Sequence, residues 1–167
     1  EYNGDPNNVT LLGGSAGGQL VGMAALNLDT AAPNTVKGVV ALSGPFDFVS
    51  LMEEDLRGET RSKSFSMNIP RALGCKITRP KEAPVTTTCT EEVEREWSPV
   101  DHVTACPRHW LMFNSENELI PLMQEDEMAS ALTAAGCTFT ADVEPGEGHA
   151  FAYWSKVRPT ITGFVND

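Results

Sequence analysis

The amino-acid sequence predicts an α/β fold in which a parallel β-sheet is flanked by helices. Short apolar runs rich in β-branched residues alternate along the chain with longer segments of helical composition. Such alternation is typical of parallel strands joined by right-handed helical crossovers. The chain has 167 residues, 41% of them hydrophobic, which is enough for one domain with its own core.

The first part of this pattern, residues 1–45, contains a strand, a helix and a second strand. VTLLG at residues 9–13 predicts a buried strand, and the Ala-, Leu- and Met-rich stretch 16–28 predicts a helix. VKGVVALS at residues 36–43 predicts another buried strand, which ends at Gly44-Pro45.

Residues 46–100 have a different character. Proline, threonine and charged residues are scattered without a sustained period, although short helices are expected near 48–56 and 91–97. We interpret this segment as a cap or lid inserted between two parts of the α/β core, residues 1–45 and 101–167.

The second part of the core repeats the alternation. WLMFN at 110–114 and TFTADV at 138–143 predict strands, and 121–135 between them predicts a helix with proline near its first turn and acidic residues early. A final helix is expected over 150–165, interrupted or started around Pro159.

Composition narrows the classes of partner. The net charge is −11 with only 12 Lys and Arg, so no basic stripe is available for nucleic acid or an anionic membrane surface. No apolar run of about 18 residues is present, so no membrane span is expected. No metal or cofactor is expected either, because the cysteines lack metal-binding spacings.

The four cysteines favour two disulfides, Cys75–Cys89 and Cys106–Cys137. Cys75 and Cys89 both fall in the irregular middle segment, whereas Cys106 and Cys137 each precede a predicted strand, and neighbouring parallel strands would bring them together. Disulfides imply a secreted or extracellular protein. The alternative is a cytoplasmic protein with four buried free thiols.

Gly13-Gly-Ser15-Ala16-Gly17 matches the pattern G-x-S-x-G between a predicted strand and a predicted helix. A sharp strand-to-helix turn at this place projects a serine hydroxyl above the sheet as a nucleophile. The amide of Ala16, at the start of the helix, can serve as an oxyanion donor. The alternative is a glycine-rich turn in which Ser15 caps the helix.

Several segments together resemble the carboxylesterase and esterase/lipase type of α/β-hydrolase. These are GDPNNV at 4–9 followed by GGSAGG at 13–18, SGPFD at 43–47, LIP at 119–121 and GEGHAF at 146–151. They run from end to end of the chain in the family's order. The resemblance implies the C-terminal half of such a hydrolase, cleaving a small-molecule carboxylic ester through an acyl-enzyme.

In this family the histidine loop supplies the base, which the resemblance places at His149. A histidine in a glycine-flanked loop after the last strand could take the serine proton, because its pKa lies near neutrality. The alternative is an ordinary exposed loop histidine. His102 and His109 flank the entry to the third strand, at the wrong end of the sheet, and are expected to be structural.

The acidic member of the triad is where the pattern breaks. The family has an aspartate four residues before the proline that corresponds to Pro121, and here that position is Asn117. Asparagine can hold an imidazole but supplies no charge. Three explanations remain open: Glu118 or Glu116 reaches His149, Asp47 serves instead, or the hydrolase is impaired.

Two further features of the family are missing from the sequence. No His-Gly-Gly type loop supplies a second oxyanion donor, and the first half of the sheet is absent. We therefore expect an N-terminal companion chain or segment that completes the fold. A peptidase or amidase of the same fold and a non-catalytic binding protein are the alternative functions.

The cap segment contains apolar residues that could line an acyl pocket or form the core of the insertion. They are Phe46, Phe48, Leu51, Met52, Phe65, Met67 and Ile69.

Overall fold

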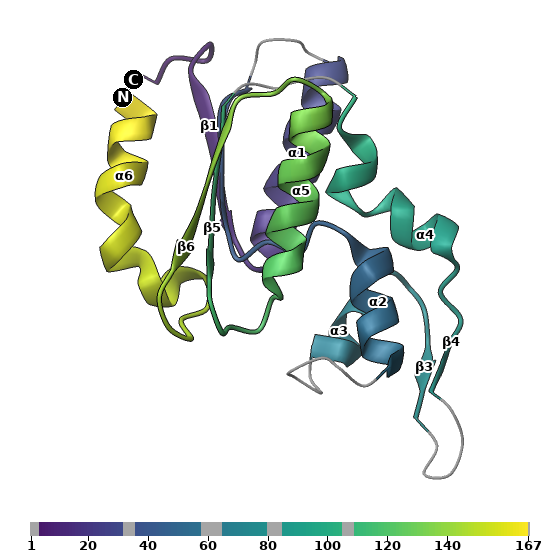
Figure 1. Ribbon diagram of the computed structural model, residues 1–167. Coiled ribbons are helices and arrows are strands. Elements are labelled where there is room, and N and C mark those ends of the chain that lie inside the picture. Colours follow the sequence, from purple (N-terminus) through teal and green to yellow (C-terminus); the bar gives the residue numbers. More distant parts are fainter. Residues whose placement is uncertain (1–3, 32–35, 58–64, 80–84, 105–108, 167) are drawn as a thin grey trace.

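The computed structural model describes residues 4–31, 36–57, 65–79, 85–104 and 109–166. In this part of the chain a four-stranded parallel sheet has the order β1-β2-β5-β6 (Figure 1). The strands are β1 (Val9–Gly14), β2 (Val36–Leu42), β5 (His109–Ser115) and β6 (Phe139–Glu144). The predicted α/β fold and the positions of its strands are confirmed.

Helices cover both faces of the sheet. α1 (Ala16–Ala31) and α5 (Leu122–Ala134) lie on one face, and α6 (Trp154–Asn166) lies on the other (Figure 1). Successive strand residues point to opposite faces, so the central strands β2 and β5 contribute side chains to two cores, one on each face of the sheet. Val39, Ala41, Trp110 and Met112 pack with α1 and α5, whereas Val40, Leu42, Leu111 and Phe113 pack with α6.

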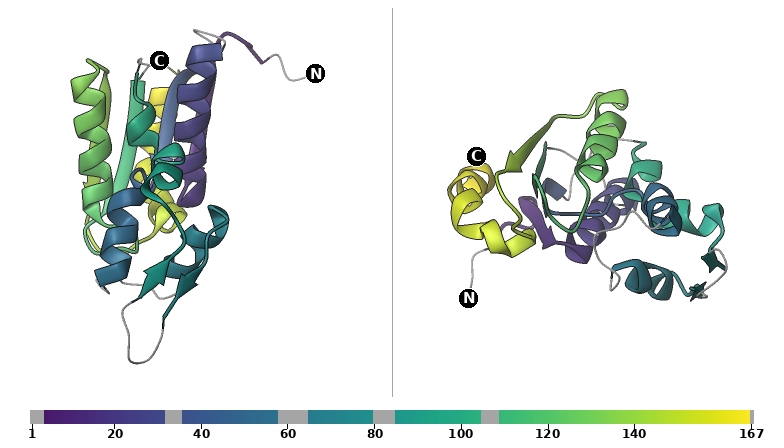
Figure 2. Two further views of the ribbon diagram at one scale, coloured as in Figure 1. Left: turned by 90° about the vertical axis from the view of Figure 1, so that its right-hand side faces the viewer. Right: turned by 60° about the horizontal axis from the view of Figure 1, so that its bottom comes forward.

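The described residues between 46 and 100 form small elements, most of which lie beyond the carboxyl ends of the strands, whereas α4 lies beside the sheet domain (Figures 1 and 2). These elements are α2 (Phe48–Arg57), α3 (Phe65–Ala72), the antiparallel pair β3 (Ile77–Thr78) and β4 (Thr86–Thr87), and α4 (Glu91–Glu96). Phe48, Leu51, Met52 and Ile69 form a small core of their own. The division into a core and a cap stays a prediction.

The helix α3 and the β3–β4 pair were not expected from the sequence. α3 contains Pro70, which usually ends a helix, and each strand of the β3–β4 pair is two residues long. Such short strands carry no detectable alternation of polar and apolar residues. The pair is fastened covalently, because the predicted disulfide Cys75–Cys89 is present, with a separation of 5.2 Å between its Cα atoms.

The second predicted disulfide lies partly outside the described residues. Cys137 is disulfide-bonded, and its expected partner Cys106 is not among the residues that the structure describes. No helix in the described part of the chain has the length and apolar run needed to cross a bilayer.

The last helix differs from expectation at Pro159. A short 3-10 turn spans Ala150–Tyr153, and α6 then continues through Pro159 without a break. Proline at this position leaves the carbonyl of Ser155 without its helical partner. Both residues are exposed, so water can replace that hydrogen bond, while Val157 and Ile161 hold the helix on the sheet.

Candidate active site

Ser15 occupies a sharp turn between β1 and α1. Its φ of 56° lies in the left-handed region, which a residue other than glycine adopts at a cost and often at functional sites. A Cβ atom at Gly13 would lie 2.1 Å from the carbonyl oxygen of Gly17, so strand and helix can cross this closely only because glycine stands there. The Ser15 amide donates to the Leu42 carbonyl at 2.8 Å, which fastens the turn to β2.

Ala16 is the first residue of α1. The first amides of a helix have no intrahelical acceptor and carry partial positive charge. The Ala16 amide, which follows Ser15 directly in the chain, is therefore a donor of the kind that stabilises negative charge.

His149 is the last residue of the loop between β6 and the 3-10 turn Ala150–Tyr153, which precedes α6. The loop is attached to the end of β5, because the Asn117 amide donates to the Gly146 carbonyl at 3.0 Å and the Ser115 hydroxyl donates to the Gly148 carbonyl. The His149 side chain remains 31% exposed, so solvent can reach the ring.

The histidine loop packs directly on the serine turn. A Cβ atom at Gly14 would lie 3.0 Å from the Ala150 Cβ and 2.8 Å from Cε2 of Phe151. The residue before Ser15 therefore touches the two residues after His149. Glycine at position 14 allows this close approach, which brings the two predicted catalytic residues to one place at the carboxyl edge of the sheet.

Glu118 is the carboxylate that contacts His149. Its Oε2 accepts a hydrogen bond from Nδ1 of the ring, and its Oε1 accepts from the Ser43 hydroxyl and, at 3.1 Å, from the Ser115 amide. The residue is 5% exposed, whereas its neighbours Glu116 and Asn117 are exposed. With Nδ1 bound to the carboxylate, Nε2 is the ring nitrogen left to face a substrate or a hydroxyl.

The other candidates for the acidic position have different roles in the structure. Asp47 Oδ1 accepts from the amides of Val49 at 2.8 Å and Ser50 at 3.3 Å, which makes it the N-terminal cap of α2. Glu116 Oε2 accepts from the Gly146 amide at 3.3 Å. Asn117 contributes its backbone amide to the histidine loop.

Two residues of this site, Ser43 and Tyr153, were not expected to belong to it. Ser43 follows β2 with a φ of 51° and is fully buried, and its hydroxyl lies 2.7 Å from the Tyr153 hydroxyl. The Ser43 Oγ also accepts from the Ala150 amide at 2.9 Å. The positive φ has no signature in the sequence, although the SGP run at 43–45 suggests a turn.

A cavity of about 510 Å³ opens beside Ser15. Its wall consists mostly of apolar side chains from α1, α3 and the end of α4, and Glu118 and His149 are not part of it. The lining residues are Ser15, Ala16, Gln19, Leu20, Pro45, Phe48, Asn68, Ile69, Ala72, Leu73, Trp97 and Leu119. Phe48 and Ile69, for which the sequence left open a pocket wall or the core of the insertion, line this cavity and also belong to that small core. The side chains of Phe65 and Met67 lie outside the described part of the structure.

Gln19 fixes one wall of this cavity. Its side chain is 5% exposed and its Nε2 donates to the Trp97 carbonyl at 2.8 Å. The hydrogen bond joins α1, which carries the serine turn, to the segment after α4. The Trp97 side chain, 43% exposed, is thereby placed at the rim of the cavity.

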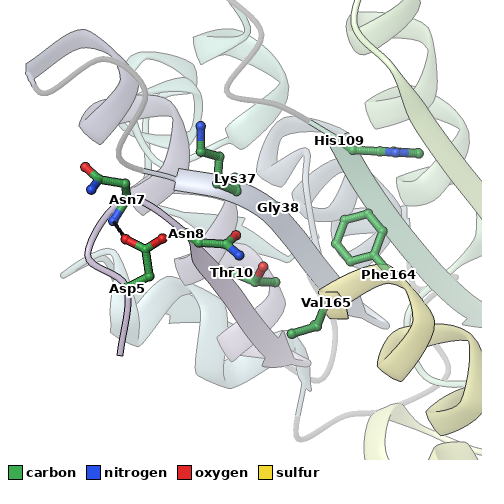
Figure 3. Close-up of a pocket in the computed structure, with 9 residues that line it drawn as sticks. All are labelled: Asp5, Asn7, Asn8, Thr10, Lys37, Gly38, His109, Phe164 and Val165. Atoms are coloured by element: carbon green, nitrogen blue, oxygen red, sulfur yellow. Dashed lines mark hydrogen bonds between the residues drawn. The ribbon is translucent and has the colours of Figure 1, made fainter. Parts of the chain in front are cut away.

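A second hollow, of about 550 Å³, lies at the opposite end of the strands (Figure 3). Lys37 and His109 line it together with Phe164 of α6, and the His109 ring meets Phe164 edge-on at 5.2 Å between centroids. His109 therefore lies at the amino end of β5, away from Ser15. His102 Nε2 lies 2.8 Å from the Glu96 carbonyl, as a structural contact would.

The fold and this arrangement agree with comparisons to known proteins. The model of a family with the alpha/beta hydrolase fold matches residues 1–153. The chain belongs to this family, and hydrolase is the class of protein that the fold and the match define.

One curated relative is a probable carboxylic ester hydrolase, LipM, of Mycobacterium tuberculosis. It is 26% identical over 175 aligned residues, which cover 99% of this chain and 37% of LipM. The chain therefore spans little more than a third of the length of that relative. A companion chain or segment that completes the sheet stays a prediction.

Solved structures show the same fold at low sequence identity. A puromycin-hydrolyzing peptidase of Mycobacterium tuberculosis superposes with a TM-score of 0.72 at 22% identity, covering 96% of this chain and 21% of that chain. Esterase B from Lactobacillus rhamnosis superposes with a TM-score of 0.68 at 14% identity, covering 97% of this chain and 53% of that chain. Both esterases and peptidases thus share this architecture.

Proposed function

We propose that this protein is a serine hydrolase that cleaves carboxylic esters through an acyl-enzyme intermediate. The observation that carries the proposal is the Glu118–His149 hydrogen bond, made by a loop that packs on the residue before Ser15. An ionisable acid, a histidine and a serine on a strained turn are the parts that nucleophilic acyl transfer needs. The relative named as a carboxylic ester hydrolase supports ester over amide chemistry.

In the proposed reaction Ser15 Oγ attacks the ester carbonyl carbon while His149 Nε2 takes the hydroxyl proton. The Ala16 amide donates to the oxyanion that forms on the carbonyl oxygen. Collapse of this intermediate breaks the bond to the alcohol oxygen, which leaves with the proton from His149. A water molecule then repeats the sequence on the acyl-enzyme, releasing the acid and regenerating Ser15. Glu118 holds the ring and stabilises its charged form throughout.

The lining of the cavity beside Ser15 indicates that the part of the substrate bound there is uncharged and apolar. No side chain with a formal charge is among its lining residues in the described part of the chain. Burying a charged group without a partner costs several kcal/mol, so a charged ester should be rejected. A half-buried aliphatic wall and the Trp97 ring instead suit an alkyl or aryl group.

The serine mechanism is tested with a fluorophosphonate probe on the full-length protein, followed by hydrolysis of p-nitrophenyl butyrate. We expect a covalent adduct on Ser15 and ester hydrolysis, and loss of both in Ser15→Ala. Absence of an adduct on a folded protein would mean a non-catalytic, hydrolase-like binding protein. An adduct together with faster cleavage of p-nitroanilides than of esters would mean a peptidase or amidase.

The pocket is tested by comparing neutral and anionic esters of the same leaving group, butyrate against hemisuccinate. We expect kcat/KM to favour the neutral ester by at least about tenfold, the equivalent of 1.4 kcal/mol. Leu73→Lys should reduce this preference, because it places a cation in the cavity wall. Equal rates on both esters in both proteins would contradict the proposed use of this cavity.

We further propose that the protein works outside the cytoplasm. The Cys75–Cys89 disulfide supports this, since structural disulfides persist mainly in oxidising compartments. Thiol titration of protein recovered from its native source under denaturing conditions tests the proposal: accessible Cys75 and Cys89 thiols would contradict it.

A further inference from the structure

Ser43 is a buried hydroxyl for which the reaction has no direct use, yet it lies at the meeting point of three segments. It directly follows β2, its Oγ contacts the Glu118 carboxylate from the loop before α5, and the same atom accepts from the Ala150 amide beside His149. The Ser43 amide donates to the Phe113 carbonyl at 2.7 Å, which fixes the backbone against β5. The residue is 0% exposed, so no water competes for these bonds.

The hydrogen bonds of Ser43 can be assigned by counting protons. A hydroxyl has one proton and two lone pairs. An ionised carboxylate only accepts, so the Ser43 proton points to Glu118 Oε1. The Ala150 N–H then fills one lone pair of Oγ, and the Tyr153 hydroxyl oxygen lies 2.7 Å from the same atom.

Tyr153 is a neutral hydroxyl group beside Ser43. Burial raises the pKa of its phenol above the ordinary value, the hydrogen bond with Ser43 opposes this rise, and the Glu118 charge adds to it. The net shift is upward, so the proton stays on the oxygen. The Tyr153 hydroxyl donates to the Phe113 carbonyl at 2.9 Å, and the second lone pair of that carbonyl accepts from the Ser43 amide. Tyr153 and Ser43 are therefore joined both by the contact of their hydroxyl oxygens and through the end of β5.

We propose that Ser43, supported by Tyr153, is a positioning residue that holds the Glu118–His149 pair in its working arrangement. Its single oxygen fixes the acid through the hydroxyl proton and the histidine loop through the Ala150 amide. A shift of either segment would break one of these bonds, so Ser43 couples the orientation of the carboxylate to that of the ring. This inference rests on the proposed function.

The backbone of Ser43 agrees with such a role. A φ of 51° is unfavourable for serine and is kept only where the surroundings hold it. Glycine would adopt this conformation more easily but would remove the hydroxyl. The hydrogen bonds of the Ser43 hydroxyl therefore explain why serine, and not glycine, occupies this strained position.

The test compares Ser43→Ala with Ser98→Ala in the full-length protein. Ser98 is an equally buried serine whose hydroxyl donates to the Glu94 carbonyl at 2.8 Å and accepts from the Phe48 amide at 2.8 Å, so its hydrogen bonds involve neither Glu118 nor the histidine loop. We expect Ser43→Ala to lower kcat by about 10- to 100-fold with little change in KM, as for the loss of a hydrogen bond to a charged group. Ser98→Ala should lower the melting temperature but leave kcat within about twofold.

A double-mutant cycle shows whether Ser43 acts through Glu118. In a Glu118→Gln background the Ser43→Ala change should lower kcat by less than about twofold, because the pair works as a unit. Full additivity of the two losses, or a Ser43→Ala enzyme with wild-type kcat, would overturn the inference. The proposed function would still stand if Ser15 were labelled and Glu118→Gln were inactive.

Tyr153→Phe and Ser43→Gly keep the inference testable if Ser43→Ala does not fold. Tyr153→Phe retains the buried ring and removes one donor, so kcat should fall by about 2- to 10-fold. Ser43→Gly relieves the positive φ and should match the loss expected for Ser43→Ala. Unchanged kcat in both folded variants would overturn the inference as well.

Discussion

Glu118 and Glu125 lie seven positions apart, in the loop after β5 and in the first turn of α5, and both are buried, at 5% and 6% exposure. Glu118 is surrounded by donors, namely the Ser115 amide, the Ser43 hydroxyl and the His149 ring. At Glu125, desolvation, with smaller contributions from Asp126, Asp142 and Glu118, raises the pKa to about 8. The comparison shows that burial alone favours the protonated carboxyl group. A buried carboxylate can hold a histidine only where hydrogen-bond donors of the fold already surround it.

The largest effect expected from this comparison is that of Glu118→Gln. Glutamine fills the same space but removes the charge that stabilises the imidazolium. Its NH₂ group can donate to Nδ1, which favours the tautomer whose proton is on Nε2 and leaves no base facing Ser15. The equivalent change in a serine protease lowers kcat by about 10⁴, and we expect a loss of about 10³ to 10⁴ here. Steady-state hydrolysis of p-nitrophenyl butyrate measures it.

Glu116→Gln is the matched control for that experiment. Glu116 is two positions away and exposed, and its carboxylate contacts a backbone amide of the histidine loop. Its kcat should stay within about threefold of the wild type, as for most surface substitutions. A large loss in Glu116→Gln with none in Glu118→Gln would reverse the assignment of the acid.

A second prediction concerns stability, and it sharpens the contrast at Glu125. A carboxyl group whose folded pKa is raised from 4.5 to about 8 binds its proton more tightly in the folded protein. Its contribution to the free energy of unfolding is therefore fully present below about pH 4.5 and is lost as the pH rises towards 8. Glu125→Gln removes this dependence and should be more stable than the wild type at pH 8 by a margin of order a few kcal/mol.

Urea denaturation of both proteins at pH 5 and pH 8 measures this effect. The difference between the proteins is the relevant quantity, because Glu94, with a pKa raised to about 6 mainly by burial, changes the wild type and the variant alike. A stability difference that is the same at both pH values would show that Glu125 is ionised normally in the folded state.

The smallest predicted effect separates the causes of the Glu125 shift. Asp142 on β6 is exposed and contributes a Coulombic repulsion that ranks below desolvation. Asp142→Asn should therefore change the pH dependence of stability by no more than about 0.5 kcal/mol. Loss of most of the pH dependence in this variant would mean that charge repulsion, rather than burial, dominates at Glu125.

The placement of Ser15 and His149 at one edge of the sheet could be predicted from the sequence because their surroundings are local. The turn at Ser15 requires small residues at fixed neighbouring positions, and the five-residue pattern G-x-S-x-G contains them. The contact between the two loops, through Gly14 and Ala150, is invisible in the sequence, but the alternation of strands and helices already places both loops at one edge of the sheet.

The carboxylate that contacts His149 could not be predicted in the same way. Glu116, Asn117 and Glu118 are consecutive, and nothing in their order reveals which side chain is turned inward. The structure distinguishes them because Glu118 meets Ser43, 75 positions earlier, and His149, 31 positions later. The Ser43–Tyr153 contact joins residues 110 positions apart, so no local pattern could have indicated it.

The sequence by itself determined the order of strands and helices, the serine turn and the Cys75–Cys89 pair, because periodicity, glycine spacing and proximity in the chain are local properties. The tertiary structure decided which carboxylate faces the histidine, which serine holds it and which glutamate is left desolvated. Those outcomes depend on burial and on donors contributed by distant segments, and they arise only when the β2, β5 and α6 ends meet at the carboxyl edge of the sheet.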